Sequence, residues 1–303
     1  MKKTSSDIIF DSINITFVAL IIIVMVYPLY FVIIASLSDP YAVANGKVTF
    51  WIKGLSFDAY KYTFKHKEIW LGYMNTIFYT LVGTGLNLLL TIPTAYSLSK
   101  KKLPGRSFIS WYFLFTMYFG GGLIPTYLLV RDLNLLNKPY TIPLLGGISI
   151  YNTIVTRIFY QTTIPDELYE AAYIDGASDF RQFFQIALPL SAPIIAVITL
   201  FYGVGRWNDY YTALIYVSKS DYYPLQMVLR SILIQNKSTL DAIDTVSTQF
   251  VDDEYVAKVA RQAYMAEAMK YSLIIIASAP LLVAYPFVQK HFVKGVMIGS
   301  LKG

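Results

Sequence analysis

Small and acidic residues occur at defined spacing in one segment of the chain, residues 161–190. They are Glu170, Ala171, Ala172, Asp175, Gly176 and Ala177, and the apolar residues Ile186, Leu188 and Pro189 follow them. A carboxylate can pair with an arginine or lysine of another protein, and small side chains let a second backbone approach closely. This is the chemistry of recognition. Spacing alone therefore indicates a docking element, although a solvated amphipathic loop would have a similar pattern.

The same segment carries the signals of two short helices. Pro165 followed by two acidic residues is typical of a helix start, where proline fits the first turn and carboxylates face the positive end of the helix. Gly176 is placed to end that helix with a positive φ. Ser178 can begin a second helix over 180–187, which Pro189 stops. We therefore predict a helix–glycine–helix hairpin.

The chain lacks the residues that most catalytic and metal-binding sites need. The 303-residue chain has no cysteine, which excludes disulfides, thiolate metal sites and cysteine nucleophiles. Its two histidines, His66 and His291, are far apart in sequence. No Gly-x-x-x-x-Gly-Lys-Ser/Thr phosphate-binding loop occurs. We therefore expect no catalytic residue, no metal and no cofactor bound by this chain.

The composition is that of a protein embedded in a lipid bilayer. Hydrophobic residues make up 55% of the chain and charged residues 15%, against about 25% charged residues in soluble domains. The mean hydropathy is +0.49. The net charge of +6 has a topological explanation in membrane proteins, so we expect no nucleic-acid partner.

Six stretches are long and apolar enough to span a bilayer, which needs about 20 residues each. They are residues 13–37, 73–99, 107–130, 140–160, 193–216 and 271–289. The first is too long for a signal peptide and has no clean cleavage site, so we expect an uncleaved helix. The predicted fold class is an all-α integral membrane protein with six transmembrane helices, and residues 1–303 form a single transmembrane domain.

Positive charge indicates which side of the membrane the loops face. Three lysines and an arginine lie within the short turn 100–106, and lysines flank both termini, whereas the loop between the third and fourth spans carries only Arg131 and Lys138. Because lysine and arginine accumulate in short cytoplasmic loops, we expect a multi-pass protein with both termini in the cytoplasm. The segment 38–70 opposes this assignment, since it holds five lysines on the predicted outer side.

Polar residues interrupt the fifth span at Arg206 and Asp209. One interpretation is a local i, i+3 ion pair. The other is that Trp207, Asn208 and Asp209 line a path for a hydroxyl-rich solute, because charged groups at membrane depth usually face a cavity or each other.

Glycines interrupt the third span at Gly120, Gly121 and Gly122, just before Pro125. A backbone break should face protein or a water-filled cavity, and close helix packing through small residues is the alternative. Buried asparagines should bond between helices, and the candidates are Asn75, Asn87 and Asn152. The longest extramembrane connection, 217–270, is predicted to be helical over 255–270, either as a solvated cap or as a contact for an external partner.

The residues of segment 161–190 also carry a resemblance to a known family. Glu170-Ala-Ala, Asp175-Gly-Ala and Ile186-x-Leu-Pro resemble, at the full spacing, the EAA motif in the membrane subunits of ABC importers. Phe119-Gly-Gly-Gly-Leu-Ile-Pro-Thr-Tyr, Gly205-Arg-Trp-Asn-Asp-Tyr and the final segment 292–303 resemble the carbohydrate branch. This branch comprises permeases similar to the smaller membrane subunit of the maltose system, and to LplC-like oligosaccharide permeases in particular.

The resemblance implies a type I importer (MetI-like) fold, with a permease core over 71–290, in a bacterial cell membrane. It implies import of a sugar, with an oligosaccharide favoured; a permease for a peptide or another polar solute, or a secondary transporter, is the alternative. The implied partners are a second related permease, two ATPase subunits that bind ATP and Mg²⁺, and an external solute-binding lipoprotein.

The resemblance also assigns roles within the hairpin. Glu170 would pair with a basic residue in a cleft of the ATPase, and Ala171, Ala172 and Gly176 would allow close approach. Asp175 would brace the turn. Leu188 and Pro189 would fix the second helix against the base of the fifth span.

Overall fold

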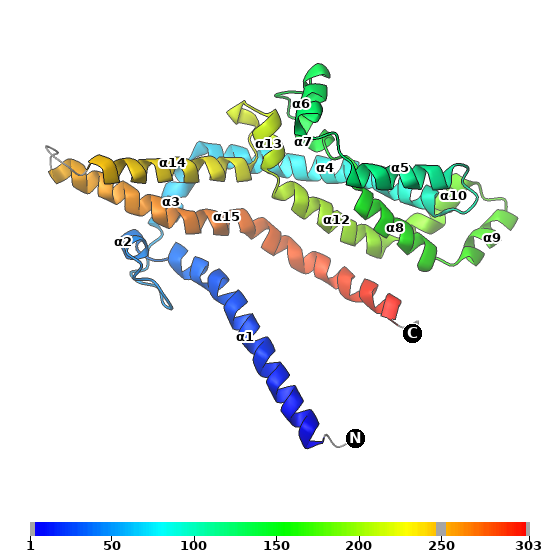
Figure 1. The fold of residues 1–303 in the computed structure, drawn as a ribbon, viewed down its shortest axis with the longest axis horizontal. Coiled ribbons are helices and arrows are strands. Elements are labelled where there is room, and N and C mark those ends of the chain that lie inside the picture. Colours follow the sequence, from blue (N-terminus) through cyan, green and yellow to red (C-terminus); the bar gives the residue numbers. More distant parts are fainter. Residues whose placement is uncertain (1–3, 247–252, 301–303) are drawn as a thin grey trace. The chain divides into compact units, whose positions relative to one another are not determined.

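The structure is a computed structural model that describes residues 4–246 and 253–300. Within these ranges the regular structure is helical, apart from one isolated antiparallel bridge between Ser38 and Leu55. The elements, shown in Figure 1, are α1 (Ser5–Ser36), α2 (Pro40–Ala44), α3 (Asp58–Lys65), α4 (Lys67–Ser99), α5 (Arg106–Tyr118), α6 (Leu123–Asp132), α7 (Thr141–Leu144), α8 (Ile150–Thr162), α9 (Asp166–Ile174), α10 (Asp179–Gln182), the π-helix η1 (Phe183–Ala187), α11 (Leu188–Leu190), α12 (Ala192–Trp207), α13 (Tyr211–Tyr216), the 3₁₀ turn η2 (Ser220–Tyr222), α14 (Leu225–Val246) and α15 (Asp253–Ser300).

Three of the predicted spans are unbroken helices that are long and apolar enough to cross a membrane. They lie in α1, in α4 and in the Arg261–Val283 part of α15. Two further candidates are broken: α5 and α6 meet at 110°, and the segment Asp179–Leu190 meets α12 at 76°. The all-α membrane class is confirmed, and the predicted helix 255–270 is part of α15, which also contains the sixth span.

The prediction of one continuous fourth span over 140–160 is wrong. α7 has four residues and α8 has thirteen, and residues 145–149 between them are not helical. Gly146 has a φ of +70°, and the Ser149 side chain accepts a hydrogen bond from the Asn152 N–H as the N-cap of α8. These local turn and cap preferences outweigh the apolar pattern.

The fifth span, predicted over 193–216, is also divided. α12 ends at Trp207 and α13 begins at Tyr211. Between them the Asp209 carboxylate accepts a hydrogen bond from the Thr212 N–H at 3.0 Å, as at a helix start.

The chain forms two compact units. The first contains residues 1–67 and 229–279. In it, Ile34 and Ala35 near the end of α1 are buried with Val43 of α2, and the Phe31 ring meets Tyr271 edge-on. Most of α1 is exposed: only 6% of its most apolar 18-residue stretch is buried. Such a surface is suited to lipid or to another protein.

The second unit contains residues 68–228 and 280–303. Its core is built from α4, α8, η1 and α12, and includes Tyr96, Tyr160, Phe183, Ala187 and Ile198. Figure 1 shows α4, α5, α8 and α12 running together, with α9 and α10 at one end of them.

Two of the predicted asparagines bond to carbonyls distant in the chain, but mostly to connecting segments and not from helix to helix. Asn87 donates to the Gly146 and Gly147 carbonyls at 2.8 Å each. Asn75 donates to the carbonyls of Asp221 and Tyr223. Asn152 is buried.

Candidate functional site

The hairpin predicted at 161–190 forms, and its first helix ends as expected. α9 follows Pro165, with Asp166 and Glu167 in its first turn. Gly176 has a φ of +75°. Its N–H donates to the Tyr173 carbonyl, and the Ala177 N–H donates to the Ala172 carbonyl. This pair of bonds is a Schellman motif, which satisfies the last carbonyls of α9. Asp175 is the C-cap residue.

The second helix begins as predicted but does not stop at Pro189. The Ser178 side chain caps α10 by accepting from the Arg181 N–H. The chain then stays helical through η1 and α11 to Leu190. A proline within a helix clashes with the carbonyl four residues earlier, here that of Gln185. The π-helix lies at that position, and its wider turn accommodates the ring.

The residues of the motif divide between an exposed and a buried set. Glu170, Ala171 and Gly176 are exposed. Ala172 is buried within the chain, so close approach by a partner is left to Ala171 and Gly176. Ile186 and Leu188 are half-buried, and Pro189 is exposed. Leu188 packs against the core shared by α4, α8 and α12.

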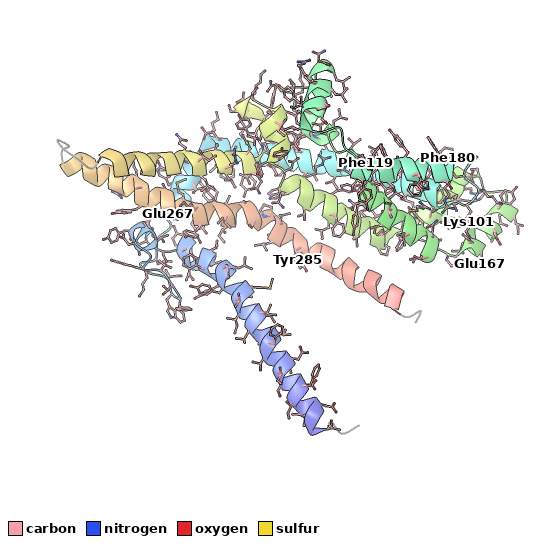
Figure 2. The ribbon with its side chains drawn as sticks, in the orientation of Figure 1. Lys101, Phe119, Glu167, Phe180, Glu267 and Tyr285 are labelled. Carbon is pink, nitrogen blue, oxygen red and sulfur yellow. The ribbon has the colours of Figure 1, made fainter. Side chains whose placement is uncertain are left out.

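Large apolar side chains surround the turn of the hairpin and are exposed. The exposed fraction is 84% for Ile174, 78% for Phe180 and 75% for Tyr173. Figure 2 shows Phe180, Lys101 and Glu167 at the same end of the second unit. We call Glu170, Tyr173, Ile174 and Phe180 the hairpin face. The apolar part of this face was not predicted from the sequence, although three large apolar residues around Gly176 were a signal for it.

A lysine joins the hairpin to the end of α4. The Lys100 ammonium lies 2.8 Å from the centre of the Tyr169 ring in α9 and 4.7 Å from that of Tyr96 in α4. Next to it, Lys101 Nζ pairs with the Asp166 carboxylate at 3.1 Å. Burial lowers the pKa of Lys100 to about 8, and the carboxylates of Asp166 and Asp179 oppose that shift. We call the contact of the Lys100 ammonium with the rings of Tyr169 and Tyr96 the Lys100 clamp.

The candidate path residues at the end of α12 make mostly local contacts. Trp207 is 5% exposed, and its ring lies 6.2 Å from that of Tyr73. Asn208 is exposed and donates to the Val204 carbonyl. Asp209 is half-buried and caps α13. The polar groups of Asn208 and Asp209 are therefore the more accessible part of this set.

The glycines between α5 and α6 form the predicted break. Gly122 has a φ of +87°. A methyl group added at Gly121 or Gly122 would meet only Pro125, at 3.9 Å, and at Gly120 it would meet nothing. All three are exposed. Among the residues that the structure describes, no group therefore packs closely on these glycines.

Arg206 does not form the predicted local pair with Asp209. Its guanidinium instead donates to the carbonyls of the broken fourth span and to the Asn87 amide oxygen. The carbonyls are those of Ile142, Pro143, Leu145 and Gly146, at 2.8 to 3.3 Å. This contact could not be predicted from the sequence, because the partners are mostly backbone atoms distant in the chain.

Known proteins are similar to this chain along most of its length. The family model described as binding-protein-dependent transport system inner membrane component matches residues 69–298. Protein LplC of Bacillus subtilis (strain 168) is 38% identical over 303 residues, covering 100% of this chain and 98% of that protein. The polygalacturonan/rhamnogalacturonan transport system permease protein YtcP of the same organism is 36% identical over 295 residues, covering 97% and 99%.

A solved structure is also similar in fold. One chain in the crystal structure of a bacterial ABC transporter involved in the import of the acidic polysaccharide alginate matches with a TM-score of 0.84 and 30% sequence identity. The match covers 96% of this chain and 99% of that chain.

Proposed function

Because the chain belongs to the family of binding-protein-dependent transport system inner membrane components, it is a membrane permease of an ABC importer rather than an enzyme, and we propose that its solute is an oligosaccharide. Its fold is that of the MetI-like permeases, and it works with other ABC components. The proposal of a sugar is supported by the saccharides named for YtcP and for the alginate importer. A peptide or another polar solute is the alternative.

The hairpin face is the observation that carries the coupling role. An exposed apolar surface beside a carboxylate is costly unless a partner covers it. We assign that partner as an ATPase subunit, with Glu170 paired to one of its basic residues and with Ala171 and Gly176 allowing close approach. Two such ATPases would bind the ATP and Mg²⁺, and the face would lie in the cytoplasm together with both termini.

The contacts behind the hairpin explain how it would transmit motion. Phe183 and Ala187 of η1 are buried in the same core as residues of α4 and α12, and the Lys100 clamp ties α9 to α4. A displacement of the hairpin by ATPase closure would therefore move these helices as one body. Alternating access of this kind requires contacts that differ between two states.

The proposed complex has further members, namely a second related permease and an external solute-binding lipoprotein that delivers the sugar. Asn208 and Asp209, with Trp207 behind them, would offer the amide, carboxylate and aromatic groups that sugar rings require. Gly121 and Gly122 would leave the backbone between α5 and α6 open to the path or to the second permease.

Reversing the charge of Glu170 tests the coupling role. We expect Glu170→Lys to lower sugar uptake at least tenfold and to weaken assembly with the ATPase, because losing one partner of an interfacial ion pair costs about 2 kcal/mol or more. Glu167→Lys is the matched control, since Glu167 is an exposed glutamate of the same helix. Normal uptake by Glu170→Lys at normal expression would refute the assignment.

Two measurements test the transport class and the solute. Uptake should stop when the ATPase is inactivated. Uptake that survives this loss but collapses with the proton gradient would identify a secondary transporter. ATPase stimulation of the reconstituted complex by a panel of loaded binding proteins should be strongest with an oligosaccharide, and stimulation by a peptide-loaded protein alone would overturn the sugar assignment.

A further inference from the structure

An apolar cavity lies between the end of α4, α5 and α8. Its volume is about 130 Å³, and Leu98, Phe113, Leu114 and Ile154 supply most of its wall. Apolar cavities of similar size take up small hydrocarbons. The cavity belongs neither to the hairpin face nor to the candidate path at the end of α12.

An arginine enters this apolar wall with part of its guanidinium unsatisfied. Arg157 of α8 donates from Nη1 to the Ser110 hydroxyl at 3.0 Å. Its Nε is buried and has no hydrogen-bond partner in the described structure. A buried donor of a charged group is costly to leave unpaired.

A second arginine adds its charge to the same place. Arg106 Nε donates to the carbonyl of Leu98, a residue of the cavity wall, at 3.0 Å. Between residues 4 and 246 and between 253 and 300, no carboxylate forms an ion pair with either arginine. Two guanidinium groups at the same cavity wall, neither of them in an ion pair among the described residues, attract an anion.

We propose that this cavity binds one anionic phospholipid, with its phosphate on Arg157 and Arg106 and part of an acyl chain against Leu98, Phe113 and Ile154. Within a membrane, a phospholipid is the ligand that brings a phosphate and an alkyl chain together. The exposed Lys102 follows Leu98 of the cavity wall by four residues and adds positive charge near it. The assignment to the cytoplasmic leaflet rests on the proposed function, whereas the site itself does not.

Lipid retention by the purified complex tests the site directly. The detergent-solubilised complex is titrated with dioleoylphosphatidylglycerol or dioleoylphosphatidylcholine, and bound lipid is counted by native mass spectrometry. We expect Arg157→Gln and Arg106→Gln each to weaken phosphatidylglycerol retention about fivefold, the effect of one basic residue near an anionic surface. Phosphatidylcholine retention should not change.

Two further variants keep the test independent of folding. Arg157→Lys preserves the charge and should retain more phosphatidylglycerol than Arg157→Gln. Arg131→Gln is the matched control, because Arg131 is exposed and already paired with Asp132, and it should behave as the unmodified chain. Each complex is compared only after its subunits co-elute in size exclusion.

Three results would overturn the proposal. One is unchanged phosphatidylglycerol retention in both arginine variants, as expected if a carboxylate of a neighbouring subunit covers the site. Another is full competition by glycerol 3-phosphate, which has the anion without the chains. The third is equal loss in Arg131→Gln. None of these readouts depends on the transported solute, so failure of the lipid site is distinguishable from failure of the proposed function.

Discussion

At the scale of single residues, Lys100 has a structural role that its charge alone does not suggest. The four positive residues at 100–106 indicate the cytoplasmic side. In the structure, Lys100 is held between the rings of Tyr96 and Tyr169, whereas Lys102 is exposed and its ammonium lies 5.9 Å from the nearest ring centre. A contact with two partly buried rings is the stronger cation–π arrangement.

Removing the Lys100 charge should therefore uncouple ATP hydrolysis from transport. We expect Lys100→Met to raise the ATP hydrolysed per sugar imported severalfold, because a cation–π contact of this kind contributes about 1–2 kcal/mol. Lys100→Arg should restore coupling, since guanidinium also stacks on aromatic faces. Lys102→Met is the matched control, and an equal effect in that variant would contradict a specific clamp.

The pKa of Lys100 makes the clamp sensitive to pH. Because burial lowers this pKa from 10.5 to about 8, the ammonium loses its proton as pH rises through about 8, and coupling should fall there. The unfolded chain keeps that proton up to about 10.5, so the same titration increases the free energy of unfolding across this window. A loss of coupling would thus not reflect unfolding.

The ratio of imported sugar to hydrolysed ATP, measured from pH 7 to 9, checks this expectation. Lys100→Arg stays charged throughout and provides the reference for every other pH effect in the complex. Parallel pH profiles of the two proteins would contradict a role for the Lys100 proton.

Residue roles set by the local sequence could be predicted, and those set by distant contacts could not. Gly176 and Ser178 act through their own backbone and nearest turns, so their types and positions sufficed. Ala172 is buried, and Arg206 binds carbonyls 60 or more residues away. Neither fact follows from the spacing of the motif.

At the scale of elements, the hairpin depends on one backbone conformation. Gly176 has a φ of +75°, and a methyl group added there would meet nothing within 4 Å. A substitution is therefore opposed only by backbone strain. For a residue with a Cβ, this positive φ costs about 1–2 kcal/mol.

We expect Gly176→Ala to loosen the end of α9 without unfolding the core. Hydrogen exchange of the Gly176 and Ala177 amides should speed up about tenfold, and Gly176→Asn should be affected less because asparagine tolerates this conformation. Gly85→Ala is the matched control, since Gly85 lies inside α4 with equally free space. Unchanged exchange in Gly176→Ala would show that the turn does not need a positive φ.

The spans show what an apolar pattern does and does not specify. The composition was enough to locate the apolar segments. Whether each segment forms one continuous helix depends on turn and cap signals such as Gly146 and Ser149. Asp209 similarly ends one helix and begins the next. The wide turn before Pro189 was not predictable, because a proline normally ends a helix and a π-helix is the rarer outcome.

At the scale of the whole molecule, the broken fourth span is completed by a side chain from the fifth. Four carbonyls between Ile142 and Gly146 accept from the Arg206 guanidinium. Backbone at membrane depth has to be satisfied internally, and here one side chain provides most of that satisfaction. The fold of the second unit thus depends on a contact between distant segments of the chain.

Replacing Arg206 should destabilise the permease in every partner complex. We expect Arg206→Gln to cost at least about 3 kcal/mol, because four carbonyls lose a charged donor. Arg206→Lys should rescue little, since a single ammonium cannot reproduce the planar array of donors. Thermal unfolding of the purified complex measures this loss of stability, and Arg131→Gln is the control. A melting temperature of Arg206→Gln equal to that of the unmodified protein would contradict the prediction.

The Arg206 contact also has a consequence for biogenesis. While the ribosome is still translating, residues 142–146 enter the membrane before Arg206 exists. Asn87 can already donate to the Gly146 carbonyl, but the Arg206 guanidinium becomes available only after about sixty further residues have been made. The fourth and fifth spans should then be integrated as a pair. A truncated chain that ends at Leu200 and is released from the ribosome should leave this segment open to protease, whereas a released chain that ends at Pro224 should protect it.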